Sequence, residues 1–273
     1  YVGGHQTHPD VAAAGDGFVV TWTSGHDNGT DGIFQQRFDS TGSAVGGETA
    51  VNSWTSDWQQ RSSVTTLADG GYVVVWQSLQ DGATYGGTYA QRYDAAGNPV
   101  GHEFQLNSYR TNGQIEPDIT ALDDGGFVAV WQSWLQDGSG WGIYTQRYDA
   151  DGREVGGEQQ ANTYEIGDQS DASITGLTGG GYVVSWTDAR GQLNGRSFDA
   201  SGNPLGAEFR VDGGLSTWES GSTVIALADG GFLAAWRGHA GGQQGILAQR
   251  FDHQGNKIGA EFTVAANGAG VDV

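Results

Sequence analysis

The sequence contains no cysteine and no methionine among its 273 residues, and Lys257 is its only lysine. Without cysteine, the chain can form neither a disulfide framework nor a thiolate metal site. No apolar run approaches the length of a membrane span, and the segments show no helical periodicity. A phosphate-binding loop, a dinucleotide fingerprint and a Gly-x-Ser-x-Gly motif are also missing. We expect Tyr1 to mark a processing boundary.

Basic residues are scarce as well: 12 stand against 32 acidic residues, for a formal net charge of −20. Such a surface repels nucleic acids and anionic membranes, so we exclude both as partners. The 48 glycines would suggest disorder if they were aperiodic, but the chain also carries 10 Trp, 10 Tyr and 10 Phe. A chain so rich in aromatic residues packs a core, and its glycines need a structural role.

Two landmarks recur five times in a fixed order along the chain. The first is a glycine, an aromatic or aliphatic run and a tryptophan; these tryptophans are Trp22, Trp76, Trp131, Trp186 and Trp236, spaced 54, 55, 55 and 50 residues apart. The second is an Arg–aromatic–Asp segment (Arg–Ser–Phe–Asp in the fourth copy), followed by an Asp-x-x-Gly turn such as Asp94 to Gly97. The chain is therefore five copies of one unit.

Each copy predicts four short antiparallel strands joined by tight turns, with the second strand apolar on both faces. This pattern is typical of a propeller blade, whereas the alternative, a solenoid, stacks shorter coils, usually of parallel strands. We predict an all-β, five-bladed β-propeller in a single domain, 1–273, and a monomer. The expected blades cover about 5–53, 60–108, 114–163, 169–213 and 219–266.

Features that recur in every copy are predicted to belong to the scaffold. Each repeated arginine precedes a glutamate by 11 or 12 residues, as in Arg37 and Glu48 or Arg92 and Glu103. Across a tight turn this spacing brings two neighbouring strands together, so we expect a cross-strand ion pair in each blade.

The loops between blades, and the loops between the second and third strands, are rich in aromatic and amide groups. Aromatic faces pack against the C–H groups of sugars while short polar side chains bind hydroxyls, so we expect repeated glycan-binding sites between blades. One site would combine Trp54, Trp58 and Gln60 with Asp81 and Tyr85, and a second Tyr109 and Gln114 with Trp134, Asp137 and Trp141. The remaining candidates are Tyr164, Gln169 and Trp218.

Calcium is a further candidate ligand, although no cofactor is required by the pattern. The segment Asp27 to Gly32 resembles part of an oxygen-ligand loop, and Asp27 and Asp31 would be its metal ligands. The segment lacks the spacing and terminal glutamate of an EF-hand.

The repeat resembles a known family in its most regular copy. Asp124 to Ser133, the Gln-Asp-Gly of Gln136 to Gly138, and Gly142 to Asp149 are similar to a repeat of large secreted bacterial proteins, the hemolysin-type, calcium-associated adhesins and toxins exported by type I secretion. The resemblance covers all five copies and implies an extracellular segment of a longer bacterial protein. The blade count is similar to that of tachylectin-like sugar-binding propellers, by analogy of architecture.

These observations together predict a secreted or cell-surface, carbohydrate-binding or adhesive propeller whose partner is a glycan or surface polysaccharide. Weak repeated sites would gain affinity through multivalency. Because near-perfect repetition leaves little room for an asymmetric centre, we expect the chain not to be an enzyme. A spacer or protein-docking propeller is the alternative. A glycan-active enzyme is a third class, and it would draw on the acids that break the repeat: Glu116, Asp118, Glu165, Asp168, Asp171 and Glu219.

Overall fold

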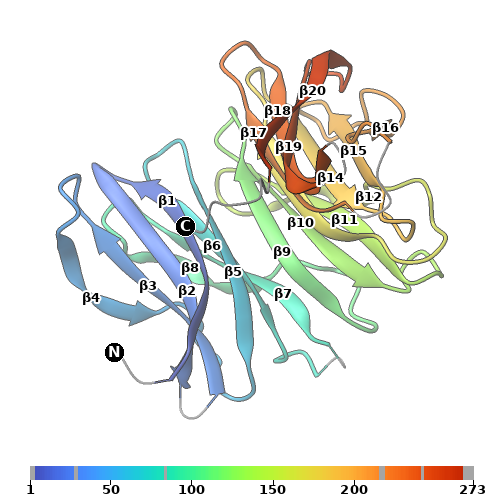
Figure 1. Cartoon of the computed structure of the whole chain (residues 1–273). Helices are drawn as coiled ribbons and strands as arrows, with labels where there is room; N and C mark the ends of the chain where they lie inside the picture. Colours follow the sequence, from blue (N-terminus) through green and yellow to red (C-terminus); the bar gives the residue numbers. More distant parts are fainter. Residues whose placement is uncertain (1–3, 28–29, 83–84, 215–218, 241–242, 267–273) are drawn as a thin grey trace. The chain divides into compact units, whose positions relative to one another are not determined.

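The computed structural model describes residues 4–27, 30–82, 85–214, 219–240 and 243–266, and in this part of the chain every regular element is a β-strand (Figure 1). No described segment forms an apolar helix long enough to cross a membrane. The strands pair in five four-stranded sheets, each in simple antiparallel order along the chain. The five-bladed β-propeller predicted from the repeats is therefore confirmed, with one sheet for each repeat.

The strands have the following bounds, in chain order and grouped by blade: β1 (Gln6–Ala14), β2 (Gly17–Asp27), β3 (Thr30–Phe38) and β4 (Ala44–Ala50); β5 (Gln59–Thr66), β6 (Tyr72–Ser78), β7 (Gly87–Tyr93) and β8 (Pro99–Gln105); β9 (Gln114–Ala121), β10 (Phe127–Trp134), β11 (Trp141–Tyr148) and β12 (Glu154–Gln160); β13 (Ser170–Gly176), β14 (Tyr182–Thr187), β15 (Leu193–Phe198) and β16 (Phe209–Arg210); β17 (Ser220–Ala226), β18 (Phe232–Ala240), β19 (Gln243–Phe251) and β20 (Lys257–Ala266).

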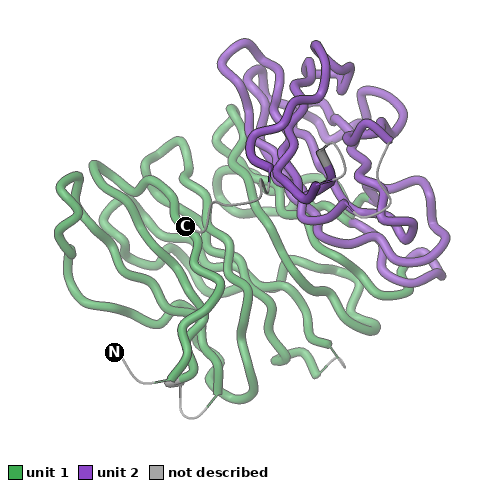
Figure 2. The backbone as a smooth tube through the Cα atoms, in the orientation of Figure 1, with its two compact units in different colours: residues 1–136, 144–159 green, residues 137–143, 160–273 purple. Residues whose placement is uncertain are grey.

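The chain forms two compact units, coloured separately in Figure 2. Unit 1 comprises residues 1–136 and 144–159, and unit 2 comprises residues 137–143 and 160–273. Each unit has a hydrophobic core of its own. In unit 1 the core includes Trp76 and Trp131, and in unit 2 it includes Trp236.

The aromatic residues of the two landmarks pack against one another inside each sheet. The ring that follows the repeated glycine stacks on the ring that follows the repeated arginine, with centroids 4.8 to 5.0 Å apart. These pairs are Phe18–Phe38, Tyr72–Tyr93, Phe127–Tyr148, Tyr182–Phe198 and Phe232–Phe251. The two landmarks are therefore the two halves of one stacked pair, which explains why they recur together.

The turn after the third strand is also as the sequence predicts. In the first blade the Gly42 amide donates to the Asp39 carbonyl over 3.0 Å. The Asp39 carboxylate accepts from the amides of Thr41 and Ser43, both at 2.9 Å. The Thr41 hydroxyl also donates to this carboxylate, at 2.7 Å. The hydroxyl bond first, and then the amide bonds, favour the ionised form and hold the pKa of Asp39 below its ordinary value.

In the second to fifth blades the predicted Arg–Glu ion pairs are wrong, because each glutamate there binds the loop that follows the preceding blade. Glu103 accepts from the Ser53 amide at 2.7 Å and from the Ser53 hydroxyl at 2.9 Å. Glu261 accepts from the Gly213 amide at 2.9 Å, and Glu158 and Glu208 make the matching bonds in their blades. The backbone amides of a loop are closer to the carboxylate than the cross-strand guanidinium is.

The arginines have other partners. Arg147 pairs with Asp124 and Arg250 with Asp229, both at the first hairpin of the same blade. Arg37 instead donates to the backbone carbonyls of Ala95 and Ala96 in the second blade. Glutamates and arginines therefore connect elements that spacing along the chain does not bring together.

Candidate functional site

The aromatic residues of the predicted glycan sites differ in exposure. Trp54 and Tyr85 are exposed, at 43% and 50%, whereas five others are partly buried: Trp58, Tyr109, Trp134, Trp141 and Tyr164. Arg190 lies over the Tyr164 ring, 4.5 Å from its centroid. Trp218 lies outside the described residues. Glycan binding by these side chains stays a prediction.

The structure adds contacts that the sequence-based grouping did not include. Gln60 donates to the Asp31 carboxylate of the first blade, and it faces Gln77, whose side-chain amide donates to the Tyr85 carbonyl over 3.0 Å. Tyr85 also lies against Gly113, in the loop that carries Tyr109. In unit 2 the Gln169 amide donates to the Trp141 carbonyl over 2.7 Å.

Several of the predicted polar ligands hold the loops in place. Gln114 and Gln169 are fully buried, and each accepts a hydrogen bond from an asparagine seven residues earlier, at 2.8 and 3.0 Å. Asp81 accepts from Gln105 at 3.1 Å and Asp137 from Gln160 at 3.2 Å. These four side chains have structural roles that the sequence-based prediction did not foresee.

The asparagine–glutamine pair recurs at the loops that follow the first three blades. In the first, the Asn52 side-chain amide donates to Gln59 Oε1 at 3.1 Å, and Asn52 Oδ1 accepts from the Ile33 backbone amide at 2.7 Å. The same bonds join Asn107 to Gln114 and Asn162 to Gln169. Amides suit this position because one side chain donates while the other accepts.

At the fourth loop both amides are replaced by acids, Asp212 and Glu219, with the same seven-residue spacing. Asp212 is 1% exposed and Glu219 is 4% exposed. Asp212 keeps the bond that anchors the loop, because it accepts from the Leu193 backbone amide at 2.9 Å. Two carboxyl groups can hydrogen-bond only when a proton lies between them, so this pair can share a proton where an amide pair cannot.

The surroundings decide which carboxyl keeps the proton. Burial raises the pKa of Glu219 to about 8, and the hydrogen bond to Asp212 and the negative charge of Asp212 act in the same direction. Burial also disfavours the charge on Asp212, but its bonds from Glu219, Leu193 and Arg210 outweigh that cost and lower its pKa. Arg210 Nε lies 2.7 Å from Asp212 Oδ1. Both shifts favour the arrangement in which Glu219 holds the proton and Asp212 carries the charge.

Glu219 lines a cavity of about 400 Å³ in unit 2, together with Ser220, Arg237, His239 and Gln244, among others. The second oxygen of Glu219, Oε2, is buried and has no hydrogen-bond partner among the described residues. Arg237 occupies the position after the repeated tryptophan, where the other blades carry Thr or Gln. A proton donor, a guanidinium and an imidazole thus border one cavity.

A second group of titratable residues lies on the first strands of the blades in unit 1. His8, Arg61 and Glu116 have backbone φ values of 50°, 58° and 53°, each at a β-bulge of β1, β5 or β9. Asp171 has a φ of 55° at the bulge of β13, in unit 2. Left-handed backbone is unfavourable for such residues, and strained residues of this kind concentrate at functional sites.

Hydrogen bonds and an ion pair join these strands in unit 1. Arg61 Nη1 lies 2.8 Å from Glu116 Oε1. The Ser63 hydroxyl lies 3.0 Å from Asp10 Oδ2 and 2.8 Å from Asp118 Oδ1. Glu116 and Asp118, two of the acids that break the repeat, are thus committed to partners on neighbouring strands.

The sequence carries a signal for the Asp212–Glu219 pair that the prediction from single residues missed. That prediction named Glu219 only as one of six acids that break the repeat. Aligning Asn52–Gln59, Asn107–Gln114 and Asn162–Gln169 with Asp212–Glu219 would have identified the substitution of a whole hydrogen-bonded pair.

The candidate calcium ligands are only partly described. Asp31 lies 2.9 Å from the His5 imidazole, Oδ1 to Nε2, and also accepts from Gln60. The side chain of Asp27 lies outside the described part of the structure. Among the described residues, no three His, Asp or Glu side chains are grouped as a metal would require. Calcium binding stays a prediction.

No protein-family model and no curated protein sequence matches this chain. Solved structures do resemble it. A protein of unknown function from Dyadobacter fermentans has a TM-score of 0.66 at 12% identity, over 97% of this chain and 84% of that one. The GH93 α-L-arabinofuranosidase of Fusarium graminearum, in complex with arabinobiose, has a TM-score of 0.60 at 12% identity, over 90% and 76%. The endo-arabinase of Bacteroides thetaiotaomicron has 0.54 at 12%, over 92% and 95%.

These similarities correct the expectation that the chain is not an enzyme. That expectation relied on the regular repetition of the blades, yet glycoside hydrolases share the same fold. At 12% identity the likeness establishes the fold alone. Regular blades therefore do not exclude catalysis, and the Asp212–Glu219 pair is the kind of asymmetric centre that the expectation ruled out.

Proposed function

We propose that this protein acts on carbohydrate, with the Glu219 carboxyl as the proton donor of a glycoside-cleaving site in unit 2. The observation that carries the proposal is the position of Glu219, which lines a cavity of about 400 Å³ and whose pKa is raised to about 8 by burial and by the neighbouring Asp212. A glycosidic oxygen is a poor leaving group unless it is protonated as its bond to carbon breaks, and a carboxyl with a raised pKa supplies that proton at neutral pH.

The proposed step is a hydrolysis. Glu219 gives its proton to the departing glycosidic oxygen while the bond between that oxygen and the sugar carbon breaks. Water adds to the sugar carbon and loses a proton, which restores the protonated Glu219 by the end of the cycle. Asp212, held ionised by Arg210, shares the proton of Glu219 before the reaction and accepts hydrogen bonds after it. This is the division of roles between two carboxyl groups in unlike surroundings.

Three further considerations support carbohydrate as the substrate class. The solved structures that share this fold include an arabinofuranosidase and an endo-arabinase. Exposed Trp54 and Tyr85 provide aromatic faces at the loops of unit 1. A formal net charge of −20 disfavours polyanionic substrates and favours neutral glycans.

The test is the release of reducing sugar from arabinan, xylan, galactan and β-glucan by the wild-type chain and by Glu219→Gln. Glutamine fills the same volume, and the four other blades already carry it at this position, as Gln6, Gln59, Gln114 and Gln169, so the variant should fold. We expect its rate to fall about 100-fold or more, as for removal of a general acid. Glu165→Gln is the matched control, because it neutralises an exposed acid near the equivalent loop.

Two outcomes would contradict the proposal. One is release of sugar by Glu219→Gln at the wild-type rate. The other is no release from any of the four polysaccharides by the wild-type chain while one of them binds to it.

We also propose that the aromatic loops bind glycan chains at repeated weak sites, because Trp54 and Tyr85 are exposed on loops of successive blades. In affinity electrophoresis, polysaccharide should retard the wild-type chain more than Trp54→Ala/Tyr85→Ala. Equal retardation would contradict this second role. We further propose that the protein is secreted, that its partner is a glycan at a cell surface, and that it is part of a calcium-associated parent protein.

A further inference from the structure

The first blade departs from the repeat at a pair of facing residues on its third and fourth strands. In three other blades a small residue on the third strand faces a phenylalanine on the fourth: Ala90 faces Phe104, Gly195 faces Phe209, and Ala248 faces Phe262. In the first blade, Gln35 faces Thr49. The small residue has become large and polar, and the phenylalanine has become small.

The phenylalanine at this position fills space against an aromatic ring of the following blade. The Phe104 ring centroid lies 5.8 Å from that of Tyr148, and the Phe209 centroid lies 5.5 Å from that of Phe251. Tyr93 is the matching ring of the second blade, and the residue that would fill the space against it is Thr49. The substitution therefore removes a whole aromatic ring from this interface within unit 1.

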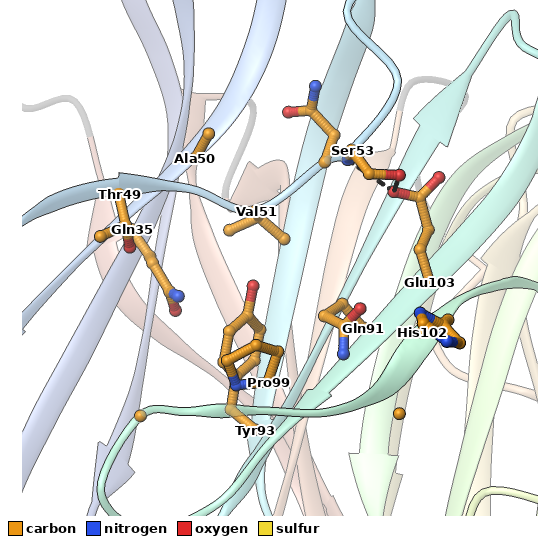
Figure 3. A pocket seen from close by; sticks show the side chains of 13 residues that line it. Gln35, Thr49, Ala50, Val51, Ser53, Gln91, Tyr93, Pro99, His102 and Glu103 are labelled. Carbon is orange, nitrogen blue, oxygen red and sulfur yellow. Dashed lines mark hydrogen bonds between the residues drawn. The ribbon is translucent and has the colours of Figure 1, made fainter.

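A cavity of about 510 Å³ occupies this place, and we call it the Thr49 pocket (Figure 3). Tyr93, Val51 and Pro99 supply apolar surface, and Gln35, Thr49 and Gln91 supply polar groups. In Figure 3 the Gln35 amide and the Tyr93 ring face the space between the two blades, while His102 and Glu103 lie at its other side. Gly97 and Gly101 line it without side chains.

Gln35 is 4% exposed, and one of its two polar side-chain atoms has a hydrogen-bond partner. Its Oε1 accepts from the Tyr72 hydroxyl at 2.9 Å, and its Nε2 makes no hydrogen bond to the described residues. The equivalent residues of three other blades, Ala90, Gly195 and Ala248, have no polar side chain to satisfy. The Nε2 of Gln35 can therefore donate to a molecule that enters the cavity.

The Tyr93 hydroxyl provides a second polar group. In the following blade the Tyr148 hydroxyl donates to the Leu106 carbonyl at 2.7 Å, whereas Tyr93, 5% exposed, shows no such bond among the described residues. Burial, joined by the nearby Tyr72 and Glu103, raises the pKa of Tyr93. The hydroxyl therefore stays neutral and able to donate. Across the cavity, Glu103 is an acceptor already bonded to Ser53 and Gln80.

We propose that the Thr49 pocket binds one neutral sugar ring. The space is that of a missing six-membered ring. Its apolar floor matches the C–H face of a pyranose, and its Gln35 and Tyr93 donors and Glu103 acceptor match hydroxyl groups, which both accept and donate. Glu103 disfavours acidic sugars. The proposal does not depend on the reaction proposed for Glu219, which belongs to a different cavity in unit 2.

The test uses the blade's own repeat to fill the pocket. Gln35→Ala/Thr49→Phe recreates the Ala90–Phe104 pair of the second blade. Saturation-transfer NMR and calorimetry with D-galactose, D-glucose, D-xylose, L-arabinose and N-acetyl-D-glucosamine measure binding to the whole chain. We expect at least one sugar to bind the wild type and none of these to bind the filled variant. The milder Thr49→Ser keeps the space and should bind as the wild type does.

Gln35→Met keeps the volume and removes the whole amide, both the donor and the acceptor of the Tyr72 hydroxyl; we expect about tenfold weaker binding. If the Gln35→Ala/Thr49→Phe variant does not fold, Gln35→Met still tests whether the pocket binds sugar. Glu219→Gln should bind the sugar normally even where it no longer cleaves glycans, so failure here differs from failure of the proposed function. The proposal is overturned if no sugar binds, if the filled variant or Gln35→Met binds as well as the wild type, or if phenol binds and the sugars do not.

Discussion

At the scale of single residues, two atoms distinguish the Asn–Gln pairs that only hold a loop in place from the Asp212–Glu219 pair that can also carry a proton. Replacing the side-chain nitrogens of an Asn–Gln pair with oxygens turns a satisfied amide contact into Asp212 and Glu219, which can share a proton. Arg210 supplies the positive charge that keeps Asp212 ionised, at 2.7 Å from Nε to Oδ1. Asp212 still accepts the hydrogen bond from the Leu193 amide that anchors the loop. The blade therefore tolerates the two acids, and the loop gains two groups that can titrate.

The raised pKa of Glu219 predicts how stability depends on pH. Its folded-state pKa of about 8 lies above the value of an unfolded glutamate, so the unfolded chain releases this proton more readily. The stabilisation from a neutral Glu219 is therefore complete below the unfolded pKa and is lost as pH rises toward 8. Glu219→Gln cannot ionise, so its unfolding free energy should decline less than that of the wild type between pH 5 and 8.

Urea denaturation at several pH values measures this difference, with Glu165→Gln as the control that should follow the wild type. If the wild type and Glu219→Gln had parallel pH profiles, Glu219 would titrate normally and the proton-sharing pair would be disproved.

At the scale of the elements, each blade is built around the close approach of its second and third strands. A Cβ atom on Gly126, just before β10, would overlap the carbonyl oxygen of Tyr148 at the end of β11, and Gly17, Gly71, Gly181 and Gly231 would meet the matching carbonyls. The glycine lets the stacked rings Phe127 and Tyr148 come within 4.9 Å of each other. This is why glycine precedes the aromatic run in every repeat.

Gly126→Ala should therefore lower the free energy of unfolding by about 1–3 kcal/mol, the usual cost of overpacking. Gly157→Ala is the control, because a Cβ there meets no atom within 4 Å, and it should change stability by less than about 0.5 kcal/mol. Chemical denaturation of the two variants measures the difference. Equal effects would mean that the backbone relaxes without cost and that the glycine has another role.

At the scale of the whole molecule, charge imbalance opposes folding and short links between repeats favour it. The formal net charge of −20 concentrates repulsion in the folded state. Glutamates such as Glu103 and Glu261 bind the loop after the preceding blade and connect neighbouring repeats. A few ion pairs, such as Arg61–Glu116, are attractive, but acidic residues outnumber basic ones 32 to 12.

Salt should therefore stabilise this protein. We expect the thermal midpoint to rise between low salt and about 0.5 M sodium chloride, since the Debye length falls to a few ångströms and repulsion is screened. The rise should be smaller at pH 4, where many carboxylates are protonated. A midpoint that falls with salt would show that attractive ion pairs dominate. Calcium chloride at matched ionic strength tests the expected calcium site, because specific binding adds stabilisation beyond screening.

Much of the fold is encoded locally and could be predicted. Glycine before an aromatic run, Asp-x-x-Gly turns and a tryptophan in every copy determined four strands per repeat and five repeats, because turns and strand alternation depend on neighbouring residues. The cross-strand Arg–Glu pairs were predicted wrongly, because the glutamates find backbone amides about 50 residues away in the chain, such as Glu103 and Ser53. Spacing within one repeat carries no information about such partners.

For the candidate sites, too, local features could be predicted and contacts between distant residues could not. The sequence alone determined that this chain is a repetitive, acidic, all-β protein with aromatic loops, and it marked Glu219 as an acid outside the pattern. Only the tertiary structure decided that Gln114 and Gln169 are buried, that Asp212 and Glu219 share a proton beside a cavity, and that Thr49 leaves room for a ring over Tyr93. Burial and proton sharing depend on the distance and dielectric surroundings of groups from different elements, and folding alone sets these.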